Sequence, residues 1–359
     1  MRAARYYGPG EMRVEDVPEP VVKEGQVKIK PLTYSDSPVC GSDVHSYFSL
    51  TPVSPTATMP HPVTKETLPI TLGHEFSGTI CELGPATDSS KLAIGQHVVV
   101  EPVISCMKPT CGPCSAGSRN ICPNATFIGV GGGGGGLAEY ITVQEDYVHV
   151  LPPTISLEVG AMMEPLSVAW HAVKRSTFVS GDTALIIGAG PIGLLILTVL
   201  RAHGASWIGI SEPALSRRET ALRLAATAVY DPRAVDVAAG TFRATSGGAA
   251  VVFDCAGTQA SLDTALAAAR PRGNVVEVAV WDKPPVLDIT ALQSKEVLLT
   301  ASQACDREHP ELIKAVADGR ITGLEELITK RIDLGDFVEQ GIKALIEDKD
   351  RQIKILVHP

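Results

Sequence analysis

The chain lacks the excess of basic residues that nucleic-acid and membrane-surface proteins carry. Its 31 Lys and Arg residues are outnumbered by 40 Asp and Glu residues, which gives a formal net charge of -9 at pH 7. Because a phosphate backbone attracts basic patches, neither a nucleic acid nor an anionic membrane is an expected partner. A long apolar run is missing too, since no stretch approaches the ~20 residues that a membrane-spanning helix needs.

The first residues also lack the features of a secretory signal. Residues 1–9 contain no apolar h-region, so we expect a cytoplasmic protein. No repeat with a period of about 20–50 residues is present, which excludes a solenoid. At about 150 residues per domain, 359 residues of which 45% are hydrophobic predict two domains, each able to bury a core. This composition excludes a disordered chain, a collagen and a small disulfide scaffold.

Residues 1–157 are predicted to be rich in β-strands. Residues 27–30 and part of 140–143 alternate with period two, and residues 97–100 form a short apolar run. The proline-rich stretch 51–69 is predicted to be a surface loop. The glycine run 131–136 resembles a phosphate cradle, but a strand rather than a helix N-terminus follows it, so a flexible loop is the favoured interpretation.

From residue 158 to 296 the pattern alternates between apolar strands and helices. Continuous apolar strands separated by helices predict a parallel sheet covered on both faces, and hence an α/β fold. The predicted strands are 183–187, 207–210, 250–253 and 274–278, and the predicted helices are 192–202 and 216–226. The tail from 297 to 359 adds a strand at 297–299, a helix near 308–318 and a closing apolar run at 353–357.

A glycine motif at the end of the first of these strands predicts a dinucleotide site. Gly188, Gly190 and Gly193 form G-x-G-x-x-G between a strand and a helix. In this context the three glycines serve a tight turn, the approach of the backbone to a pyrophosphate, and close packing of helix on strand. The helix beginning at Pro191 and Ile192 would present its N–H groups to the phosphates. A plain turn is the alternative.

An acidic residue after the next strand indicates which dinucleotide binds. Glu212 follows the strand 207–210 and lies 24 residues after Gly188, close to the ~20 expected for a ribose-binding carboxylate. A carboxylate there accepts both ribose hydroxyls and repels a 2′-phosphate, which favours NAD over NADP. Arg217 and Arg218 lie nearby; they could bind a 2′-phosphate or simply form a solvated helix face.

Four of the eight cysteines fall close together and predict a structural metal site. Cys106, Cys111, Cys114 and Cys122 lie on a short loop rich in glycine and proline. Four thiolates form a closed tetrahedral zinc site, which can fold a loop that has no core of its own. In a reducing compartment such spacing indicates metal binding before disulfides. Two alternatives remain, namely four unrelated buried cysteines, or a different first ligand in place of Cys106.

Three more residues form a candidate catalytic metal site. Cys40, His74 and Glu164 offer a thiolate, an imidazole and a carboxylate, the three-ligand pattern of a catalytic zinc with one open position. Pro165 is expected at the first position of a helix running to about residue 175, with Glu164 at its mouth. Taken singly, Cys40 and His74 could be core residues and Glu164 a helix cap, and spacing alone does not connect the three.

Taken together, these motifs resemble the zinc-dependent medium-chain alcohol dehydrogenases, most closely the branch of 2,3-butanediol and polyol dehydrogenases. The segments that carry the resemblance are Cys40-Gly41-Ser42-Asp43, Gly73-His74-Glu75-Phe76-Ser77-Gly78, the four-cysteine lobe, Glu164-Pro165-Leu166-Ser167-Val168-Ala169-Trp170-His171, Gly188-Ala189-Gly190-Pro191-Ile192-Gly193 and Ser211-Glu212-Pro213. The resemblance implies a GroES-like catalytic domain at 1–157 with a zinc lobe at about 101–125, a Rossmann NAD-binding domain at 158–296, and a return to the catalytic domain at 297–359.

The resemblance also implies roles for individual residues. Two zinc ions per chain are expected, the catalytic one on Cys40, His74 and Glu164. Glu75 would lie behind that zinc or replace a ligand during turnover. Ser42 and His45 match positions that relay the alcohol proton to solvent. The family is usually dimeric or tetrameric, so a homodimer or homotetramer is expected.

The implied function is interconversion of a secondary alcohol and its ketone by hydride transfer to and from NAD. A vicinal diol such as 2,3-butanediol is the expected substrate, and a sorbitol, xylitol or threonine dehydrogenase, or a biosynthetic dehydrogenase of a larger alcohol, would use the same parts. Alternatives of another class are a non-catalytic NAD-binding regulator and a zinc-independent reductase of the same fold. The long spacing after Cys106, the glycine run and Cys305 in the tail depart from the family pattern and bear on the substrate.

Overall fold

A computed structural model describes residues 1–35, 47–51, 53–348 and 350–358. The chain divides into two compact units, each considered by itself below. Unit 1 contains Met1–Glu164, Cys305–Ala317 and Leu327–Pro359, whereas unit 2 contains Pro165–Ala304 and Asp318–Glu326. Unit 1 is therefore built from both ends of the chain, and unit 2 from its middle.

Unit 2 contains a six-stranded sheet in which every neighbouring pair of strands is parallel. The strand order is β13-β12-β11-β14-β15-β16, so the chain starts in the middle, moves to one edge and then returns to build the other half. Ligands of such sheets bind at the carboxyl ends of the strands where this order reverses, here between β11 and β14. The strands are β11 (Thr183–Ile187), β12 (Trp207–Ser211), β13 (Ala228–Tyr230), β14 (Ala249–Asp254), β15 (Ala269–Glu277) and β16 (Leu298–Ala301).

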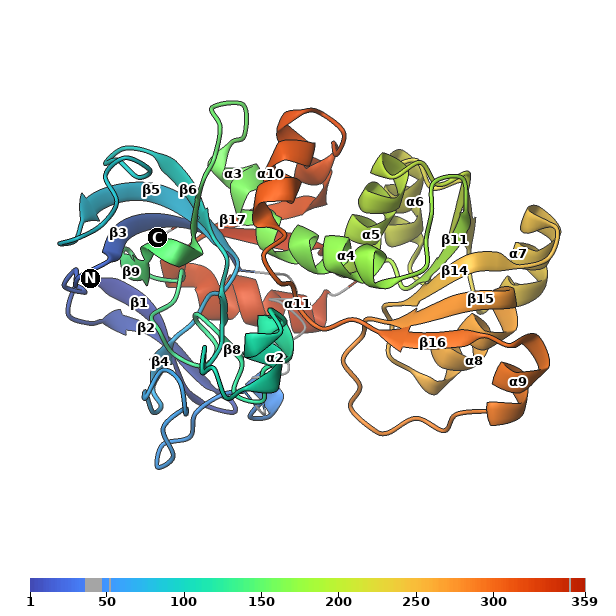
Figure 1. The fold of residues 1–359 in the computed structure, drawn as a ribbon, viewed down its shortest axis with the longest axis horizontal. Coiled ribbons are helices and arrows are strands. Elements are labelled where there is room, and N and C mark those ends of the chain that lie inside the picture. Colours follow the sequence, from blue (N-terminus) through green and yellow to red (C-terminus); the bar gives the residue numbers. More distant parts are fainter. Residues whose placement is uncertain (36–46, 52, 349, 359) are drawn as a thin grey trace. The chain divides into compact units, whose positions relative to one another are not determined.

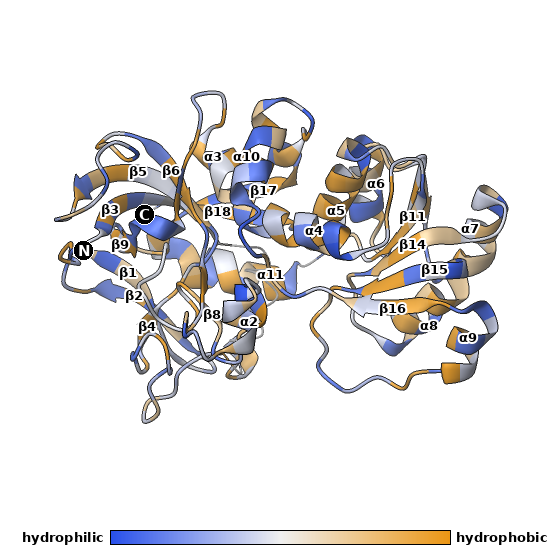
Figure 2. Cartoon of the chain, viewed as in Figure 1, coloured by the Kyte–Doolittle hydropathy of each residue, from blue (hydrophilic) through white to orange (hydrophobic). Residues whose placement is uncertain are grey.

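Helices cover both faces of this sheet. In Figure 1, α5 and α6 lie on one side and α8 and α9 on the other. The apolar colouring of β14 and α5 in Figure 2 marks the interior, where Leu185, Val252 and Leu262 belong to one buried cluster. The covering helices are α4 (Met163–Arg175), α5 (Pro191–Ala202), α6 (Leu215–Arg223), α7 (Val237–Thr245), α8 (Gln259–Ala268) and α9 (Ile289–Lys295).

The predicted strands and helices of unit 2 are present, with two differences at their ends. Helix α6 stops at Arg223 rather than at residue 226, because Ala225 adopts a left-handed conformation (φ 67°). The N–H groups of Ala225 and Ala226 then bond back to the carbonyls of Leu222 and Ala221, which closes the helix in a Schellman motif. Strand β15 begins at Ala269, five residues before the predicted start. The predicted α/β class with a parallel sheet is confirmed.

Unit 1 is dominated by a larger, mostly antiparallel sheet. Its order is β10-β6-β5-β3-β18-β17, and β9 also pairs with β3. Residues 33–35 of β3 pair with 355–357 of β18, so the last strand of the chain completes a sheet begun near the N-terminus. The strands are β3 (Gln26–Ser35), β5 (Phe76–Leu83), β6 (His97–Val100), β9 (Ile141–Gln144), β10 (Val148–Val150), β17 (Ile328–Asp333) and β18 (Lys354–His358).

Smaller elements complete unit 1. A three-stranded sheet combines β1 (Arg2–Gly8), β2 (Glu11–Asp16) and β4 (Ile70–Thr71). A separate hairpin pairs β7 (Val103–Ile104) with β8 (Thr126–Phe127). The helices are α2 (Gly112–Ser115), α3 (Leu157–Ala161), α10 (His309–Ala317) and α11 (Ala344–Glu347), with short 3-10 turns at Arg119–Ile121, Glu145–Tyr147 and Leu334–Asp336 and a π-helical turn at Phe337–Lys343. A further 3-10 turn, Leu324–Leu327, belongs to unit 2 except for its last residue.

The sequence predictions for unit 1 hold with one correction. The strands at 27–30 and 97–100 are confirmed within β3 and β6, and residues 141–143 of the predicted segment 140–143 lie in β9. The described part of 51–69 contains neither helix nor strand. Helix α4 begins at Met163, so Pro165 occupies its third position and not its first. The first four N–H groups of a helix lack intrahelical partners, so proline costs no hydrogen bond at the third position either.

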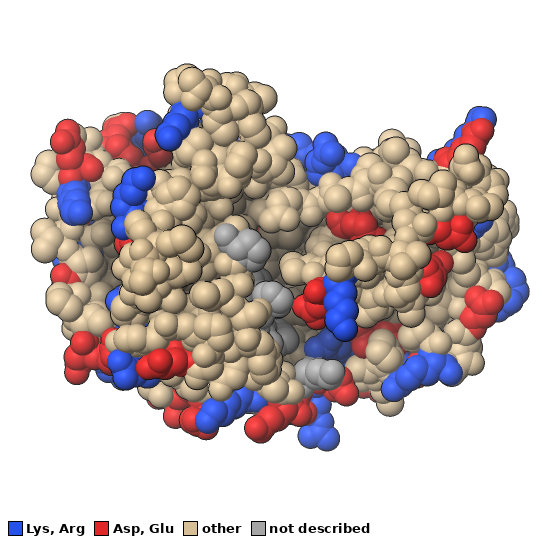
Figure 3. Space-filling model, turned by 90° about the horizontal axis from the view of Figure 1, so that it is seen from below, with Lys and Arg blue, Asp and Glu red and all other residues tan. Residues whose placement is uncertain are grey.

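The distribution of charged side chains on the surface, and the length and hydropathy of the helices, agree with what the composition predicts. On the face drawn in Figure 3, acidic and basic side chains are interspersed, and the basic ones do not gather in a patch. Among the described residues, none of the helices has the length and hydropathy that crossing a bilayer requires.

Candidate functional site

Three buried side chains of unit 1, each of a type that can bind a metal ion, lie close together. His74, Glu75 and Glu164 each offer one ligand atom, and these atoms all lie within 4.8 Å of one another. His74 and Glu75 connect β4 to β5, and Glu164 is the second residue of α4. Buried carboxylates are costly unless a cation or hydrogen bonds compensate. The fold therefore brings His74 and Glu164, predicted as ligands of one metal, into one buried group.

A contact between β5 and α3 explains how residues ninety positions apart converge. The Ser77 hydroxyl donates a 2.5 Å hydrogen bond to the carbonyl of Leu157, the first residue of α3. Gly160 lets this helix approach, since a Cβ there would lie 3.0 Å from the Cβ of Ser77 and 2.5 Å from Leu151. Helix α4 starts directly after α3, so this contact sets the position of Glu164 next to His74.

The glycine run 131–136 packs against the segment that carries His74. The Gly136 N–H donates to the Gly73 carbonyl at 2.8 Å, and a Cβ on Gly135 would lie 2.2 Å from the Leu72 carbonyl oxygen. Likewise, a Cβ on Gly131 would lie 2.0 Å from the Thr126 hydroxyl. The run is a loop, as predicted, but close backbone packing rather than flexibility accounts for its glycines. It lies outside any helix N-terminus and offers no phosphate cradle of that kind.

Glu75 has a buried basic partner on the last strand. The Lys354 ammonium donates to Glu75 Oε2 at 2.7 Å, and the two side chains are 0% and 2% exposed. Burial lowers the pKa of Lys354 well below its ordinary value. Glu75 therefore faces a buried amine from β18 on one side and the His74–Glu164 pair on the other.

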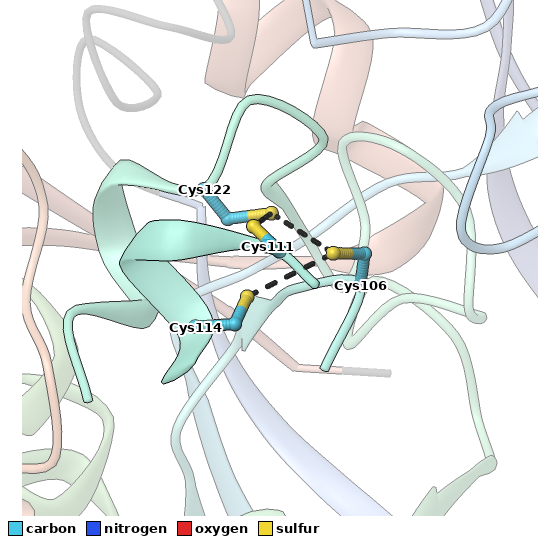
Figure 4. A group of neighbouring side chains, drawn as sticks. All are labelled: Cys106, Cys111, Cys114 and Cys122. Carbon is cyan, nitrogen blue, oxygen red and sulfur yellow. Dashed lines mark hydrogen bonds between the residues drawn. The ribbon is translucent and has the colours of Figure 1, made fainter. Parts of the chain in front are cut away.

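The four clustered cysteines also converge, in the same unit. Their sulfur atoms all lie within 4.8 Å of one another, and Figure 4 shows the four side chains pointing to a common centre. The Cys106 sulfur lies 3.8 Å from that of Cys114 and 3.5 Å from that of Cys122, and those of Cys111 and Cys122 are 3.8 Å apart. A disulfide needs about 2.05 Å. All four are therefore free thiols. Because their sulfur atoms converge, the four cysteines form one group and are not unrelated core residues.

In unit 2, the three motif glycines occupy three different environments. Gly188 adopts φ 96° in the turn after β11, which glycine tolerates best. Gly190, the N-cap of α5, has no heavy atom within 4 Å of a Cβ built on it, so this side of the turn is open. A Cβ on Gly193 would lie 2.0 Å from the Gly188 carbonyl oxygen, so the helix packs directly on the turn.

Glu212 closes this turn from the next strand. Its carboxylate accepts the Ala189 N–H and the Ala214 N–H, both at 2.8 Å, and it directly follows β12. Carboxylate oxygens keep further lone pairs for other donors. Arg218 donates to the Glu212 carbonyl at 2.6 Å and pairs with Asp231 at 3.2 Å, whereas Arg217 lies half-buried in α6.

Two acidic side chains lie at the carboxyl ends of β14 and β15. Asp254 and Glu277 are register partners on these neighbouring strands. Burial raises the pKa of Asp254 above its ordinary value, although hydrogen bonds from Ser261 and two backbone N–H groups oppose the shift. Burial and the charge of Asp254 raise the pKa of Glu277 to about 7, against a hydrogen bond from Trp281. This pair therefore holds a proton near neutral pH, a feature that the sequence interpretation missed.

Three of the predicted residues, Cys40, Ser42 and His45, lie outside the described residues.

Comparison with known proteins shows to which family the chain belongs. Residues 23–153 match the model of the alcohol dehydrogenase GroES-like domain, and residues 191–318 match that of the zinc-binding dehydrogenases. The (R,R)-butanediol dehydrogenase of Neisseria gonorrhoeae is 38% identical over 361 residues, covering 100% of this chain and 99% of that protein. The chain belongs to the zinc-binding alcohol dehydrogenase family.

Further comparisons agree with this assignment. The (R,R)-butanediol dehydrogenase of Bacillus subtilis is 36% identical over the full length of both chains. A crystal structure of 2R,3R-butanediol dehydrogenase from Bacillus subtilis superposes with a TM-score of 0.91 at 35% identity, covering 100% of this chain and 99% of that one. The predicted family, its GroES-like and Rossmann architecture and its enzymatic nature are thereby confirmed, and the alternative of a non-catalytic regulator is not supported.

Lys354, the buried partner of Glu75, is a residue that the sequence interpretation missed. A signal was available, since the lysine interrupts the apolar run 353–357 at a position whose neighbours are buried. A lysine is almost never fully buried unless it is paired. The run predicts a buried strand, and its lysine therefore predicts an acidic partner, although the sequence does not say which one.

Proposed function

We propose that this dehydrogenase interconverts a vicinal diol, of which 2,3-butanediol is the leading candidate, and its hydroxyketone, with NAD as hydride acceptor. The observation that carries the proposal is the convergence of His74 and Glu164 in one buried group. Full-length similarity to two (R,R)-butanediol dehydrogenases supports the substrate class. We further propose a homodimer or homotetramer, which light scattering on the purified protein would test.

The donor atoms fit zinc at both proposed metal sites. His74 and Glu164, with Cys40, would hold the catalytic ion through nitrogen, oxygen and sulfur, the ligands that zinc prefers. Zn–S bonds of 2.3 Å in a tetrahedron place sulfur atoms about 3.8 Å apart, and the three sulfur–sulfur distances given above for the cysteine lobe are 3.5–3.8 Å. The lobe would thus hold the structural ion on Cys106, Cys111, Cys114 and Cys122. When bound, the catalytic zinc supplies Lewis-acid polarisation of the alcohol oxygen.

Oxidation of the alcohol removes one proton and one hydride, and the chain's own residues would handle the proton. Ser42 is proposed to accept the hydroxyl proton, and His45 to pass it towards solvent. Glu75 lies beside His74, held by Lys354, and is proposed to support the ligand from behind or to replace one during turnover. When bound, NAD would supply the nicotinamide ring that accepts the hydride from the carbinol carbon.

The turn at the start of α5 is proposed to bind the pyrophosphate of NAD. Gly190 leaves open space beside the turn, and α5 begins there with Pro191 and Ile192. Pro191 has no N–H group, so the donors to the phosphates would be the N–H groups of the next residues of the first turn, beginning with Ile192. Glu212 is proposed to accept the ribose hydroxyls and to repel a 2′-phosphate. The guanidinium of Arg218 already bonds the Glu212 carbonyl and Asp231. Because these contacts engage Arg218 within the protein, they support NAD over NADP. Of the two arginines, Arg217 is then the remaining candidate for contacting the cofactor.

The test is an absorbance screen at the reduced-nicotinamide band. NAD and NADP are each supplied with 2,3-butanediol stereoisomers, sorbitol, xylitol and threonine. We expect the highest kcat/KM for a butanediol with NAD. A preference for a polyol or for threonine would refute the substrate, and a preference for NADP would refute the role of Glu212.

A variant tests the metal group separately. Glu164→Ala removes a proposed ligand, so turnover should be lost while NADH binding, followed by its fluorescence, stays close to that of the wild type. Glu158→Ala is a matched control, because Glu158 lies on the preceding helix and pairs with the exposed Arg331 instead. Wild-type turnover and metal content in Glu164→Ala would exclude Glu164 as a ligand.

A further inference from the structure

A third group of side chains of the types that can bind a metal ion lies in unit 1, apart from the two discussed above. It consists of Glu101, which follows β6, His149 in β10, and His309, the first residue of α10. Each offers one ligand atom, and these atoms all lie within 4.8 Å of one another. Glu101 is 2% exposed and His309 0%, whereas His149 is half-buried. Three segments distant in the sequence thus direct an acid and two imidazoles to one point.

The two oxygens of Glu101 face different partners. Oε1 accepts hydrogen bonds from the Arg119 guanidinium at 2.6 Å and from the Arg307 N–H at 3.0 Å. Oε2 faces the histidines, 3.3 Å from Nε2 of His149 and 3.7 Å from Nδ1 of His309. The hydrogen bonds to Oε1 hold the Glu101 carboxylate in place. Oε2 therefore faces one ring nitrogen of His149 and one of His309.

His309 is the unusual member of the group. Neither of its ring nitrogens makes a hydrogen bond to any described residue, although the ring is fully buried. Buried polar atoms are nearly always satisfied, because an unmet donor or acceptor loses its hydration without compensation. The ring plane makes an angle of 10° with that of His149, and the two centroids lie 5.3 Å apart. An ion held together with Glu101 Oε2 would satisfy Nδ1 of His309, the ring nitrogen that lies 3.7 Å from that oxygen.

These distances match a tetrahedral ion of the zinc type. With metal bonds of about 2.0–2.2 Å to nitrogen and oxygen, neighbouring ligand atoms lie roughly 3.3–3.5 Å apart. Two imidazoles on one such ion have their ring centroids about 5.2 Å apart, since a ring centre lies about 1.2 Å behind its nitrogen. The observed separations are 3.3 and 3.7 Å for the ligand atoms and 5.3 Å for the rings.

The charges around the group also favour a cation. Glu101, Asp306 and Glu308 are three carboxylates in buried or half-buried positions. The buried guanidinium among them is that of Arg119, which pairs with Glu101 and Asp306, while the side chain of Arg307 is exposed. Burial would raise the pKa of Glu101, but hydrogen bonding from His149 and the nearby positive charges lower it to about 2. Burial lowers the pKa of His309 to about 3.

We propose that Glu101, His149 and His309 bind a third divalent cation of the zinc class, with water as the fourth ligand. Two imidazoles and a carboxylate suit zinc better than magnesium or calcium, which prefer oxygen ligands. The ion would join the end of β6 and strand β10 to the start of α10. This site is separate from the proposed catalytic and structural zinc sites, and the inference does not depend on the alcohol that the enzyme oxidises.

The test counts zinc per chain by plasma mass spectrometry after dialysis against micromolar free zinc. We expect three ions in the wild-type enzyme and two in His309→Phe and in His149→Phe, which remove a ligand nitrogen but keep a ring. His97→Phe is the matched control, because His97 is exposed on β6 outside the group. It should retain three ions. A wild-type count of two, or a count that either ligand variant leaves at three, would overturn the proposal.

A measurement on the unaltered enzyme keeps the proposal testable if the His309 variant does not fold. Crystals grown at the same zinc concentration should give an anomalous difference peak at the zinc edge beside Glu101 Oε2. The peak at the four cysteines provides the internal reference for occupancy. A peak at the cysteines with none at Glu101, or one that appears only at millimolar zinc, would reduce the group to a buried hydrogen-bonded cluster.

Discussion

Replacing Lys354 by methionine removes the buried countercharge of Glu75 while keeping the length of the side chain. The ammonium and the carboxylate are 2.7 Å apart, and both are almost completely shielded from water. Removing one partner of a buried ion pair typically costs ~3–5 kcal/mol, because the other charge keeps its desolvation penalty. We therefore expect the free energy of unfolding of unit 1 to fall by about this amount.

The double variant Glu75→Gln/Lys354→Met separates the pair from mere packing. Replacing both charges removes the desolvation penalty together with the attraction, so the double variant should regain most of the stability that Lys354→Met loses. Lys343→Met is the matched control. Its partner Glu339 lies one helical turn away and both side chains are largely in water, so a loss of ~0.5 kcal/mol or less is expected.

Urea unfolding followed by far-UV circular dichroism is the appropriate assay. Tryptophan fluorescence would report on the wrong unit, because Trp170, Trp207 and Trp281 all belong to unit 2. If Lys354→Met unfolds at the wild-type urea concentration, the pair does not stabilise unit 1. If the double variant is no more stable than Lys354→Met, the lost stability comes from packing and not from charge.

Three further predictions address the other sites. Cys106→Ser should release one zinc per chain and lower the urea midpoint; zinc retention measured by plasma mass spectrometry would exclude Cys106 as a ligand. Gly193→Ala should destabilise unit 2 by ~1–3 kcal/mol, since its Cβ would lie 2.0 Å from a carbonyl oxygen. Gly190→Ala should keep the wild-type urea midpoint but weaken NADH binding, measured by fluorescence. A normal NADH affinity in Gly190→Ala would contradict the proposal that the pyrophosphate binds at this turn. The raised pKa of Glu277 means that the folded state binds its proton more tightly than the unfolded state, so stability should fall as the pH rises from about 4.5 to about 7 and then level off. Glu277→Gln should abolish that part of the pH dependence in urea titrations, and an unchanged profile would contradict the shift.

Patterns local to the chain carried much of the fold prediction. The apolar runs at 183–187 and 250–253 predict buried parallel strands, because only strands covered on both faces are apolar throughout. The glycine motif is equally local, since a positive φ at Gly188 and the close approach at Gly193 are requirements of one turn. Four cysteines within one short loop need no long-range information to predict a metal.

Long-range contacts set the rest. Nothing near His74 or Glu164 in the sequence predicts the hydrogen bond from Ser77 to Leu157 that helps to bring them together. The apolar run around Lys354 predicts a buried strand but not its neighbour, because apolarity indicates burial and not the pairing partner. The role of His309 is hidden for the same reason, since its proposed partners come from β10 and the end of β6.

The central claim is that one zinc ion is bound by the His74 imidazole and the Glu164 carboxylate. An anomalous difference map at the zinc edge, measured on crystals of the wild-type enzyme, tests it most directly. The account predicts a peak about 2.0–2.2 Å from a ring nitrogen of His74 and from a carboxylate oxygen of Glu164. A map with a peak at the four cysteines but none between His74 and Glu164 would contradict it.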